Sequence, residues 1–316
     1  MAARRWIGRE AAALKLVTGE SNPILAIEKL AANLIDDAGF DKPSFNPETL
    51  ASFRGVSEVR RVAMASAARL LPEKGSLVIE VNESHSTGKQ NFSIDHEVSH
   101  TLIPTYGNHC VDDIETGTFP IGSEEEMLCD LGAAALLLDP RWIRPLAHQA
   151  GPSIATLLSL AETFGASLEA TARQLASLDV WPCAFVVWED GLRKENRQRQ
   201  NLQLLPGFEE FGKPQPKLRV RSSYATPSFG HFVPQNKSVS ETSLIAICSE
   251  QSPFTFGVEF LDLGKGSSTI RVYCENLFAP YTRSGTTFRR VISLLLPMGQ
   301  ESSQSNLVNV FQLEAL

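Results

Sequence analysis

The chain has 316 residues, 43% of them hydrophobic, and a formal net charge of -7 at pH 7. This length allows one large domain or, as we expect, two domains with separate hydrophobic cores. The acidic balance disfavours a general nucleic-acid coat, because binding a phosphate backbone requires clustered lysine and arginine side chains. We therefore expect proteins or small molecules as partners.

The N-terminal stretch MAARRWIGREAAALKLV begins with basic residues, but Arg9, Glu10 and Lys15 interrupt the apolar run that follows. The sequence thus predicts neither a secretory signal nor a membrane span. Five cysteines are scattered without a CxxC pattern, which argues against a disulfide framework and against a cysteine-rich zinc site. These features favour a protein of the reducing cytoplasm.

The first predicted elements are a helix and a hairpin. Residues 24–38 (ILAIEKLAANLIDDA) place their apolar side chains at helical spacing, which predicts an amphipathic helix. Residues 60–82 contain two runs of strand-like composition around Pro72-Glu73-Lys74-Gly75, a turn signal. We interpret this region as a β-hairpin.

Helical spacing returns over residues 91–102, and a polar loop from Pro104 to Ser123 separates this helix from predicted helices over 124–138 and 141–149. The chain then carries two short helical patterns.

These two patterns lie within residues 153–178 and meet at Gly165-Ala166-Ser167, where Ser167 can cap the second helix. A DNA-binding helix-turn-helix is one interpretation. A helical hairpin that completes the first core is the one we favour, because the second helix offers only Arg173 for contacts with bases or phosphates.

From Cys183 onward the chain is rich in short strand-like runs separated by turn residues. The runs are AFVVWE, KLRVRSSY, SLIAICS, FTFGVEFL, STIRVYCE and RRVISLLL. They predict a second, sheet-containing domain. Residues 191–221 are basic and could contact nucleic acid, but acidic residues interrupt the run and aromatic residues are sparse, so a solvated linker is the favoured reading.

The stretch HEVSH at residues 96–100 carries the clearest chemical signal. Residues four apart on a helix lie one turn above each other, so His96 and His100 can offer imidazole nitrogens to one metal ion. In the HExxH arrangement the glutamate, here Glu97, binds no metal; it accepts a proton from the metal-bound water and passes it to the leaving amine. Two surface histidines that meet this spacing by chance are the alternative. We expect zinc, with manganese as the other ion.

A catalytic zinc ion needs a third protein ligand. Glu124, Glu125 and Glu126 open the next predicted helix and compete for this role. We favour Glu126 because Asp130 follows it by one turn and can hydrogen-bond a ligating histidine. For Glu124 and Glu125 we favour an acidic first turn that is stabilised by the helix dipole.

These features together resemble the ImmA/IrrE-type metallopeptidases over residues 23–178. The resemblance rests on the segments VIEVNES, FSIDHEVSH, EMLCDLGAAALLLDP and LAETFGASLEATARQL. It implies that His96 and His100 bind zinc, that Glu97 is the catalytic glutamate and that Glu126 is the third ligand. Asp130 falls where the family has Asn or Asp.

The chain departs from the family pattern at several positions without losing a ligand. Asp95 and Cys129 replace a usual alanine, Ser99 replaces a usual glycine, and Gly132 replaces a usual phenylalanine. Pro140 comes one residue late after Asp139.

The family consists of bacterial zinc enzymes of gluzincin type that cut transcriptional repressors of mobile elements and stress regulons. The resemblance therefore implies a cytoplasmic zinc endopeptidase whose substrate is a protein, in particular a helix-turn-helix repressor. The alternative is a non-catalytic DNA- or ligand-binding regulator that retains the peptidase fold. Glu97 favours the enzyme, because a binding module has no need of a general base.

The oxyanion formed during peptide hydrolysis needs a further hydrogen-bond donor. Tyr106 and His109, in the loop after the predicted zinc helix, are the candidates. His85 is weaker, and His148 and His231 are expected to be structural or exposed.

The expected fold class is α+β. We predict an N-terminal extension over residues 1–22 and a mainly helical HExxH metallopeptidase domain over 23–180, with a small hairpin or sheet and the helix-turn-helix-like hairpin at 153–178. A β-rich domain over 181–316 would follow, with a sensory or docking role suggested by analogy.

Overall fold

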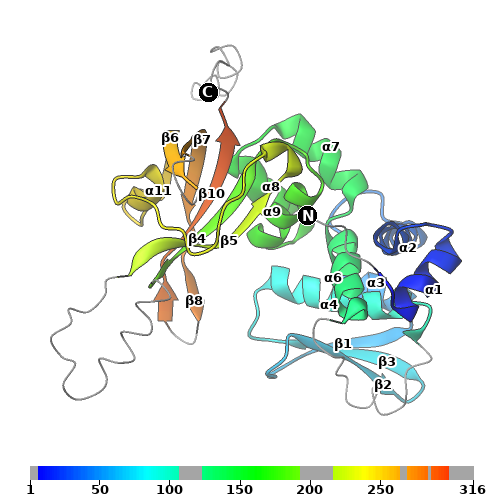
Figure 1. Ribbon diagram of the computed structural model, residues 1–316. Coiled ribbons are helices and arrows are strands. Elements are labelled where there is room, and N and C mark those ends of the chain that lie inside the picture. The colour runs from blue at the N-terminus through cyan, green and yellow to red at the C-terminus, as the bar shows by residue number, and fades with distance from the viewer. Residues whose placement is uncertain (1–5, 107–122, 193–215, 264–268, 284–285, 299–316) are drawn as a thin grey trace, which may run out of the picture. The chain divides into compact units, whose positions relative to one another are not determined.

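The computed structural model describes residues 6–106, 123–192, 216–263, 269–283 and 286–298 (Figure 1). The chain divides into two compact units. Unit 1 comprises Met1–Gly151 and Ala155–Gln174, and unit 2 comprises Pro152–Ile154 and Leu175–Leu316. The α+β class is confirmed, since helices dominate unit 1 and a five-stranded sheet dominates unit 2.

Unit 1 begins with three helices, α1 (Arg9–Thr18), α2 (Pro23–Asp37) and α3 (Pro47–Phe53). Asparagine precedes α2 and α3, and its side chain accepts a backbone N–H of the first turn in each. Proline follows each cap at the first helical position, where its missing N–H costs nothing. The helix expected over residues 24–38 is confirmed by α2, and α1 packs against α2 and α6.

A three-stranded sheet follows, formed by β1 (Val56–Val62), β2 (Ala68–Glu73) and β3 (Ser76–Asn82) in the order β1-β3-β2. The predicted hairpin is the antiparallel β2–β3 pair. Lys74 and Gly75 connect its strands with positive φ at both residues, as in the tight turn that matches strand twist. Residues 60–62 belong instead to β1, which pairs with β3 in parallel.

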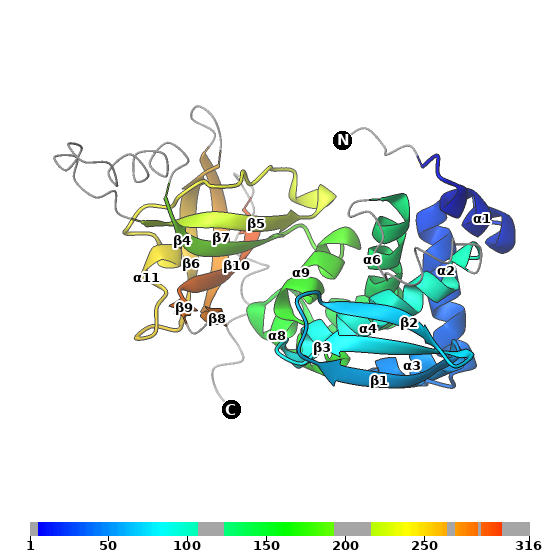
Figure 2. The same ribbon diagram turned by 90° about the horizontal axis from the view of Figure 1, so that it is seen from below.

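Helix α4 (Thr87–Leu102) crosses the sheet, and α6 (Glu124–Leu137) packs against α4. Figure 2 shows α3 and α4 on one face of the three strands. Helix α7 (Pro140–Ala150) follows α6, with Asp139 as its cap. The three helices expected over 91–102, 124–138 and 141–149 are therefore present, although α4 begins four residues earlier than expected.

The two short helices expected over residues 153–178 are α8 (Ile154–Phe164) and α9 (Leu168–Ser177). The chain turns between them at Gly165, which has a positive φ of 63°. Ser167 caps α9, since its Oγ accepts a hydrogen bond from the Ala170 N–H at 3.1 Å.

Unit 2 is built on an antiparallel sheet in the order β5-β4-β10-β7-β6. Its strands are β4 (Ala184–Gly191), β5 (Lys217–Ala225), β6 (Phe254–Asp262), β7 (Thr269–Phe278) and β10 (Arg290–Pro297). Two short strands, β8 (Tyr281–Arg283) and β9 (Thr286–Phe288), pair with each other. Strands alternate in side-chain direction, and one face carries the core that includes Trp188, Val272 and Leu295.

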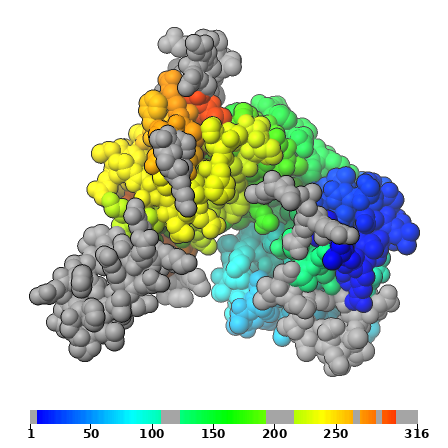
Figure 3. Space-filling model, viewed as in Figure 1, coloured from blue at the N-terminus to red at the C-terminus, as the bar shows by residue number. Residues whose placement is uncertain are grey.

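The segment SLIAICS was expected to be a strand, and this expectation is wrong. Its residues Leu244–Ile247 form the short helix α11, which contacts β6. The Ser243 Oγ caps this helix by accepting the Ile245 N–H at 3.1 Å. A short apolar run does not distinguish a strand from a buried helix by periodicity alone. Figure 3 shows the segment from β5 to β6, in yellow, on the face of unit 2 turned to the viewer.

Most of the basic stretch 191–221 lies outside the described residues, because the described chain resumes only at residue 216. Within the described part, Lys217 pairs with Glu241 and Arg221 pairs with Glu189. Among the described helices, none is both long and apolar enough to cross a bilayer.

Candidate metal centre

Helix α4 brings His96 and His100 to one face. The two imidazole rings lie with centroids 5.1 Å apart in an edge-to-face arrangement, which follows from their spacing of four residues. The side chain of His96 is 17% exposed and that of His100 is 2% exposed. One imidazole therefore borders solvent, while the other lies in the protein interior.

Glu126, on α6, faces both rings. Its Oε2 lies 3.4 Å from Nε2 of His96, and its Oε1 lies 3.4 Å from Nε2 of His100. Ser123 starts this helix and accepts the backbone N–H of Glu126 at 3.2 Å, which fixes where the carboxylate leaves α6. The ligand atoms of His96, His100 and Glu126 all lie within 4.8 Å of one another, so the three side chains could hold a metal ion.

The other nitrogen of each ring faces a second carboxylate. With Nδ1 protonated, His96 donates to Oδ1 of Asp130 at 3.0 Å, and His100 donates to Oε1 of Glu125 at 3.3 Å. Such bonds select the tautomer that leaves the Nε2 lone pair free, and they hold the ring in place. Both Nε2 atoms are thereby directed toward the carboxylate of Glu126.

Glu97 lies beside this cluster and is 9% exposed. Its carboxylate accepts a hydrogen bond from the backbone N–H of Leu70 on β2. Burial raises the pKa of Glu97, while His100 and His96 oppose the rise. Leu70 belongs to the edge strand of the three-stranded sheet, so a backbone group of the sheet helps to hold this carboxylate.

Protonated imidazole rings and the carboxylate of Glu126 stabilise each other's charge in this cluster. Burial lowers the pKa of His96, but hydrogen bonds to Asp130 and Glu126 outweigh it and raise that pKa to about 9. Burial raises the pKa of Glu126, but the bonds from His100 and His96 lower it to about 2. A metal ion that binds here must displace imidazole protons, since histidine ligates in its neutral form.

Cys129 lies on the buried side of the site, where it interacts with His100. Burial is the largest influence on this thiol and raises its pKa to about 11. The side chains whose ligand atoms converge are those of His96, His100 and Glu126, so the donor set is two imidazole nitrogens and one carboxylate oxygen. This set is typical of catalytic zinc sites, which keep a further position for water.

The remaining sequence candidates have different positions. Tyr106 is half-buried, and His100, Glu97 and Glu125 are close enough to shift its pKa, although burial is the main reason that this pKa is raised. His109 lies outside the described residues. His85 contacts the Lys89 Nζ through its Nε2 at 2.8 Å.

The last two histidines are not part of the cluster. His148 and His231 are exposed, and neither belongs to the metal-ligand group found among the described residues.

Sequence reasoning missed the roles of two neighbouring glutamates. Glu125 was assigned to the helix dipole, whereas its carboxylate contacts His100. Glu124 accepts the backbone N–H groups of Ile7, at 3.0 Å, and Gly8, at 2.6 Å, and so anchors the start of α1. Spacing along one helix indicates only the partner one turn away on that helix, whereas the contact of Glu125 with His100 joins two helices.

Asp95 is a second feature without a sequence signal beyond its departure from the family pattern. Its side chain is fully buried, and no other described residue offers either carboxylate oxygen a hydrogen bond. Burial raises its pKa well above the usual range. The acid is therefore held in its neutral form, as expected for an unpaired carboxyl in a protein interior.

Comparison with known proteins supports the family. Residues 49–176 match a peptidase family described as the IrrE N-terminal-like domain, and this domain belongs to the ImmA/IrrE-type metallopeptidases. A search of curated proteins gave no match. A solved structure described as a Mycobacterium tuberculosis transcriptional regulator shares 13% identity at a TM-score of 0.51, covering 91% of this chain and 80% of that one. At this identity the likeness concerns the fold alone.

Proposed function

We propose that unit 1 is a zinc-dependent endopeptidase that hydrolyses a peptide bond in a protein substrate. The observation that carries the proposal is the convergence of His96, His100 and Glu126, with their ligand atoms within 4.8 Å, beside the buried carboxylate of Glu97. This arrangement combines a ligand set with a general base, which are the two parts that metal-assisted hydrolysis requires.

A bound divalent ion would lower the pKa of its water and polarise the scissile carbonyl. Glu97 accepts the proton of the attacking water at its carboxylate and delivers it to the leaving amine. Its raised pKa brings it closer to the operating pH, where a general base transfers protons best. Asp130 and Glu125 keep the two imidazoles in the ligating tautomer.

Tyr106 is proposed as the donor to the oxyanion. Its raised pKa keeps the phenol protonated and able to donate a hydrogen bond. We expect Tyr106→Phe to lower the turnover rate by about 10²–10³-fold, the usual effect of losing one oxyanion donor. Metal content should stay unchanged.

The substrate proposed is a helix-turn-helix transcriptional repressor of a stress or mobile-element response in bacteria. The family resemblance supports this choice, and a repressor encoded beside the gene is the first protein to try. The experiment incubates the full chain, zinc and that repressor, and follows cleavage by mass spectrometry. We expect cutting at one or a few sites, abolished by a chelator and restored by added zinc.

The decisive variant is Glu97→Gln, which should slow cleavage by about 10²–10⁴-fold, as loss of a general base does, while metal content is retained. Glu83→Gln is the matched control, because Glu83 is exposed and lies outside the cluster. A Glu97→Gln protein that cuts as fast as the unmodified chain would overturn the proposed mechanism.

The alternative is a DNA- or ligand-binding regulator without turnover. Its support is the transcriptional-regulator description of the structurally similar protein. In that case Glu97→Gln would leave the cellular function intact, and charge reversals within residues 191–221 would abolish it. The two functions thus predict opposite outcomes for the same pair of variants.

A further inference from the structure

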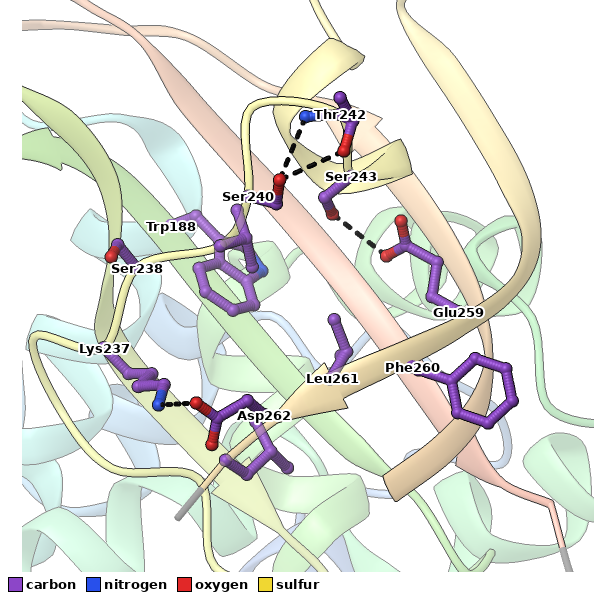
Figure 4. A pocket seen from close by; sticks show the side chains of 12 residues that line it. Trp188, Lys237, Ser238, Ser240, Thr242, Ser243, Glu259, Phe260, Leu261 and Asp262 are labelled. Carbon is purple, nitrogen blue, oxygen red and sulfur yellow. Dashed lines mark hydrogen bonds and ion pairs between the residues drawn. The ribbon is translucent and has the colours of Figure 1, made fainter. Parts of the chain in front are cut away.

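Unit 2 contains a cavity of about 420 Å³ that is remote in sequence from the metal-ligand cluster. It lies between the segment 237–243, which precedes α11, and strand β6 (Figure 4). Leu261, near the end of β6, and Leu263, just beyond it, line the apolar base of the cavity, with the buried Trp188 of β4 beside them. A small ligand could therefore bury an apolar body here.

The charged groups that line the cavity are mainly acidic. Lys237 is the lining cation, and its Nζ lies 2.7 Å from Oδ2 of Asp262. Glu259, across the cavity in Figure 4, is the second lining carboxylate. One cation and two carboxylates leave a formal charge of -1 on the lining residues, which disfavours an anionic ligand.

Neutral hydrogen-bond donors of the protein hold the carboxylate of Glu259 in place. The hydroxyl of Ser243 donates to its Oε2 at 3.0 Å, and the backbone N–H of Leu244 donates to its Oε1. The buried thiol of Cys274 lies 3.9 Å from Oε2. A carboxylate has about four acceptor positions, so this fixed carboxylate keeps acceptor capacity for a ligand.

Hydroxyl groups complete the rim. Ser240 and Thr242 lie above the apolar base and are hydrogen-bonded to each other through their hydroxyl oxygens, 3.0 Å apart. Their remaining lone pairs can accept hydrogen bonds. The cavity therefore presents acceptors and negative charge around an apolar floor, which complements a molecule with N–H donors and positive charge.

The geometry points to a binding site for a small organic cation, an ammonium group carried on an apolar body, with Glu259 as the partner of the ammonium group. A charge-assisted hydrogen bond to a fixed carboxylate is stronger than one between neutral groups. The apolar body would cover Leu261 and Leu263. This site is separate from the proposed peptidase chemistry, and its test does not depend on metal or on cleavage.

The test uses three probes with one phenyl body and different polar ends: phenethylamine, 2-phenylethanol and 3-phenylpropionate. Each is titrated into the full chain in a calorimeter at neutral pH. We expect phenethylamine to bind at least about tenfold more tightly than the alcohol, because the ammonium group adds a charge-assisted bond. The carboxylate probe should bind more weakly than both.

In the variant Glu259→Gln the carbonyl oxygen can accept the N–H of Leu244, and the amide N–H can donate to the hydroxyl of Ser243, so the fold should persist. It should weaken phenethylamine binding by about tenfold or more and leave 2-phenylethanol binding unchanged. Glu250→Gln is the matched control, because Glu250 is exposed in the same unit and does not line the cavity. Asp262→Asn provides a second loss of negative charge at an exposed site.

Asp262→Asn should also weaken amine binding, since Lys237 would then add uncompensated positive charge to the cavity. Thermal unfolding of each variant checks that unit 2 remains folded. The proposal is overturned if phenethylamine does not bind at millimolar concentration, if 3-phenylpropionate binds as tightly as the amine, or if folded Glu259→Gln binds the amine like the unmodified chain.

Discussion

Nδ1 of His96 lies 3.0 Å from Oδ1 of Asp130, one helical turn beyond Glu126 on α6. The same imidazole therefore meets one carboxylate of α6 with Nδ1 and another with Nε2. Glu125 repeats this relationship with His100. Each histidine is thus held by a carboxylate that does not compete for the metal position.

This pairing predicts the effect of removing either supporting carboxylate. Asp130→Ala and Glu125→Ala should each reduce zinc affinity by about 10–100-fold, because the imidazole loses the acceptor that fixes its tautomer and orientation. Competition with a chromophoric chelator measures the affinity. Glu124→Ala is the control, since the carboxylate of Glu124 accepts the N–H groups of Ile7 and Gly8 and does not belong to the metal-ligand group. Equal affinities for all three variants would refute a supporting role for Asp130 and Glu125.

Helices α4 and α6 lie close together at Ser99 and Gly132. A Cβ atom built on Gly132 would lie 2.7 Å from Oγ of Ser99 and 3.0 Å from Cγ1 of Ile27. Gly132→Ala should therefore lower the free energy of unfolding by about 1–3 kcal/mol, as overpacking does. Urea denaturation measures this loss.

A double-mutant cycle tests the contact itself. Ser99→Gly should cost up to about 1 kcal/mol alone, through helix propensity, yet should restore part of the stability lost in Gly132→Ala. Strictly additive effects would show that the clash with Ser99 is not the cause. The chain departs from the family pattern at both positions, and this contact gives one reason for the joint change.

Glu28 on α2 provides a prediction about pH. Its pKa is raised, first by burial and then by the negative charge of Asp139. When the pKa of an acid is higher in the folded state than in the unfolded state, the folded protein loses stability as pH rises above the unfolded-state pKa. This pKa is about 4.3 for glutamate. Glu28→Gln should therefore raise the midpoint of thermal unfolding at pH 7, and this gain should disappear as pH falls toward 4.

Unfolding of both proteins across this pH range checks the prediction. Glu162→Gln serves as the control, because Glu162 is exposed on α8 and its loss should change little. A gain for Glu28→Gln that persists unchanged at acidic pH would mean that the charge of Glu28 is not its origin.

Local sequence patterns predict those residues of the candidate site that lie one turn apart on a single helix. The spacing of His96 and His100, and that of Glu126 and Asp130, each express one turn of a single helix, so both could be predicted from residue numbers. The contact of Glu125 with His100 depends on how α4 and α6 pack. The hydrogen bond from Leu70 to Glu97 depends on where the sheet lies.

The difference between local and tertiary contacts also explains the one wrongly predicted element of unit 2. Strands with long alternating patterns, such as those in β6 and β7, were predicted from their side chains. Residues 244–247 form a helix because Ser243 caps it and Glu259, fifteen residues later, accepts the N–H of Leu244. That second contact is tertiary, and an apolar run of four residues contains no sign of it.

The most direct test is the metal content of the purified chain, measured by elemental analysis in protein prepared without chelator. The account predicts close to one zinc ion per chain, lost in His96→Ala and in His100→Ala, reduced strongly in Glu126→Gln, and retained in Glu97→Gln. The last result separates a general base from a ligand. A chain that carries no metal and binds neither added zinc nor added manganese would contradict the account.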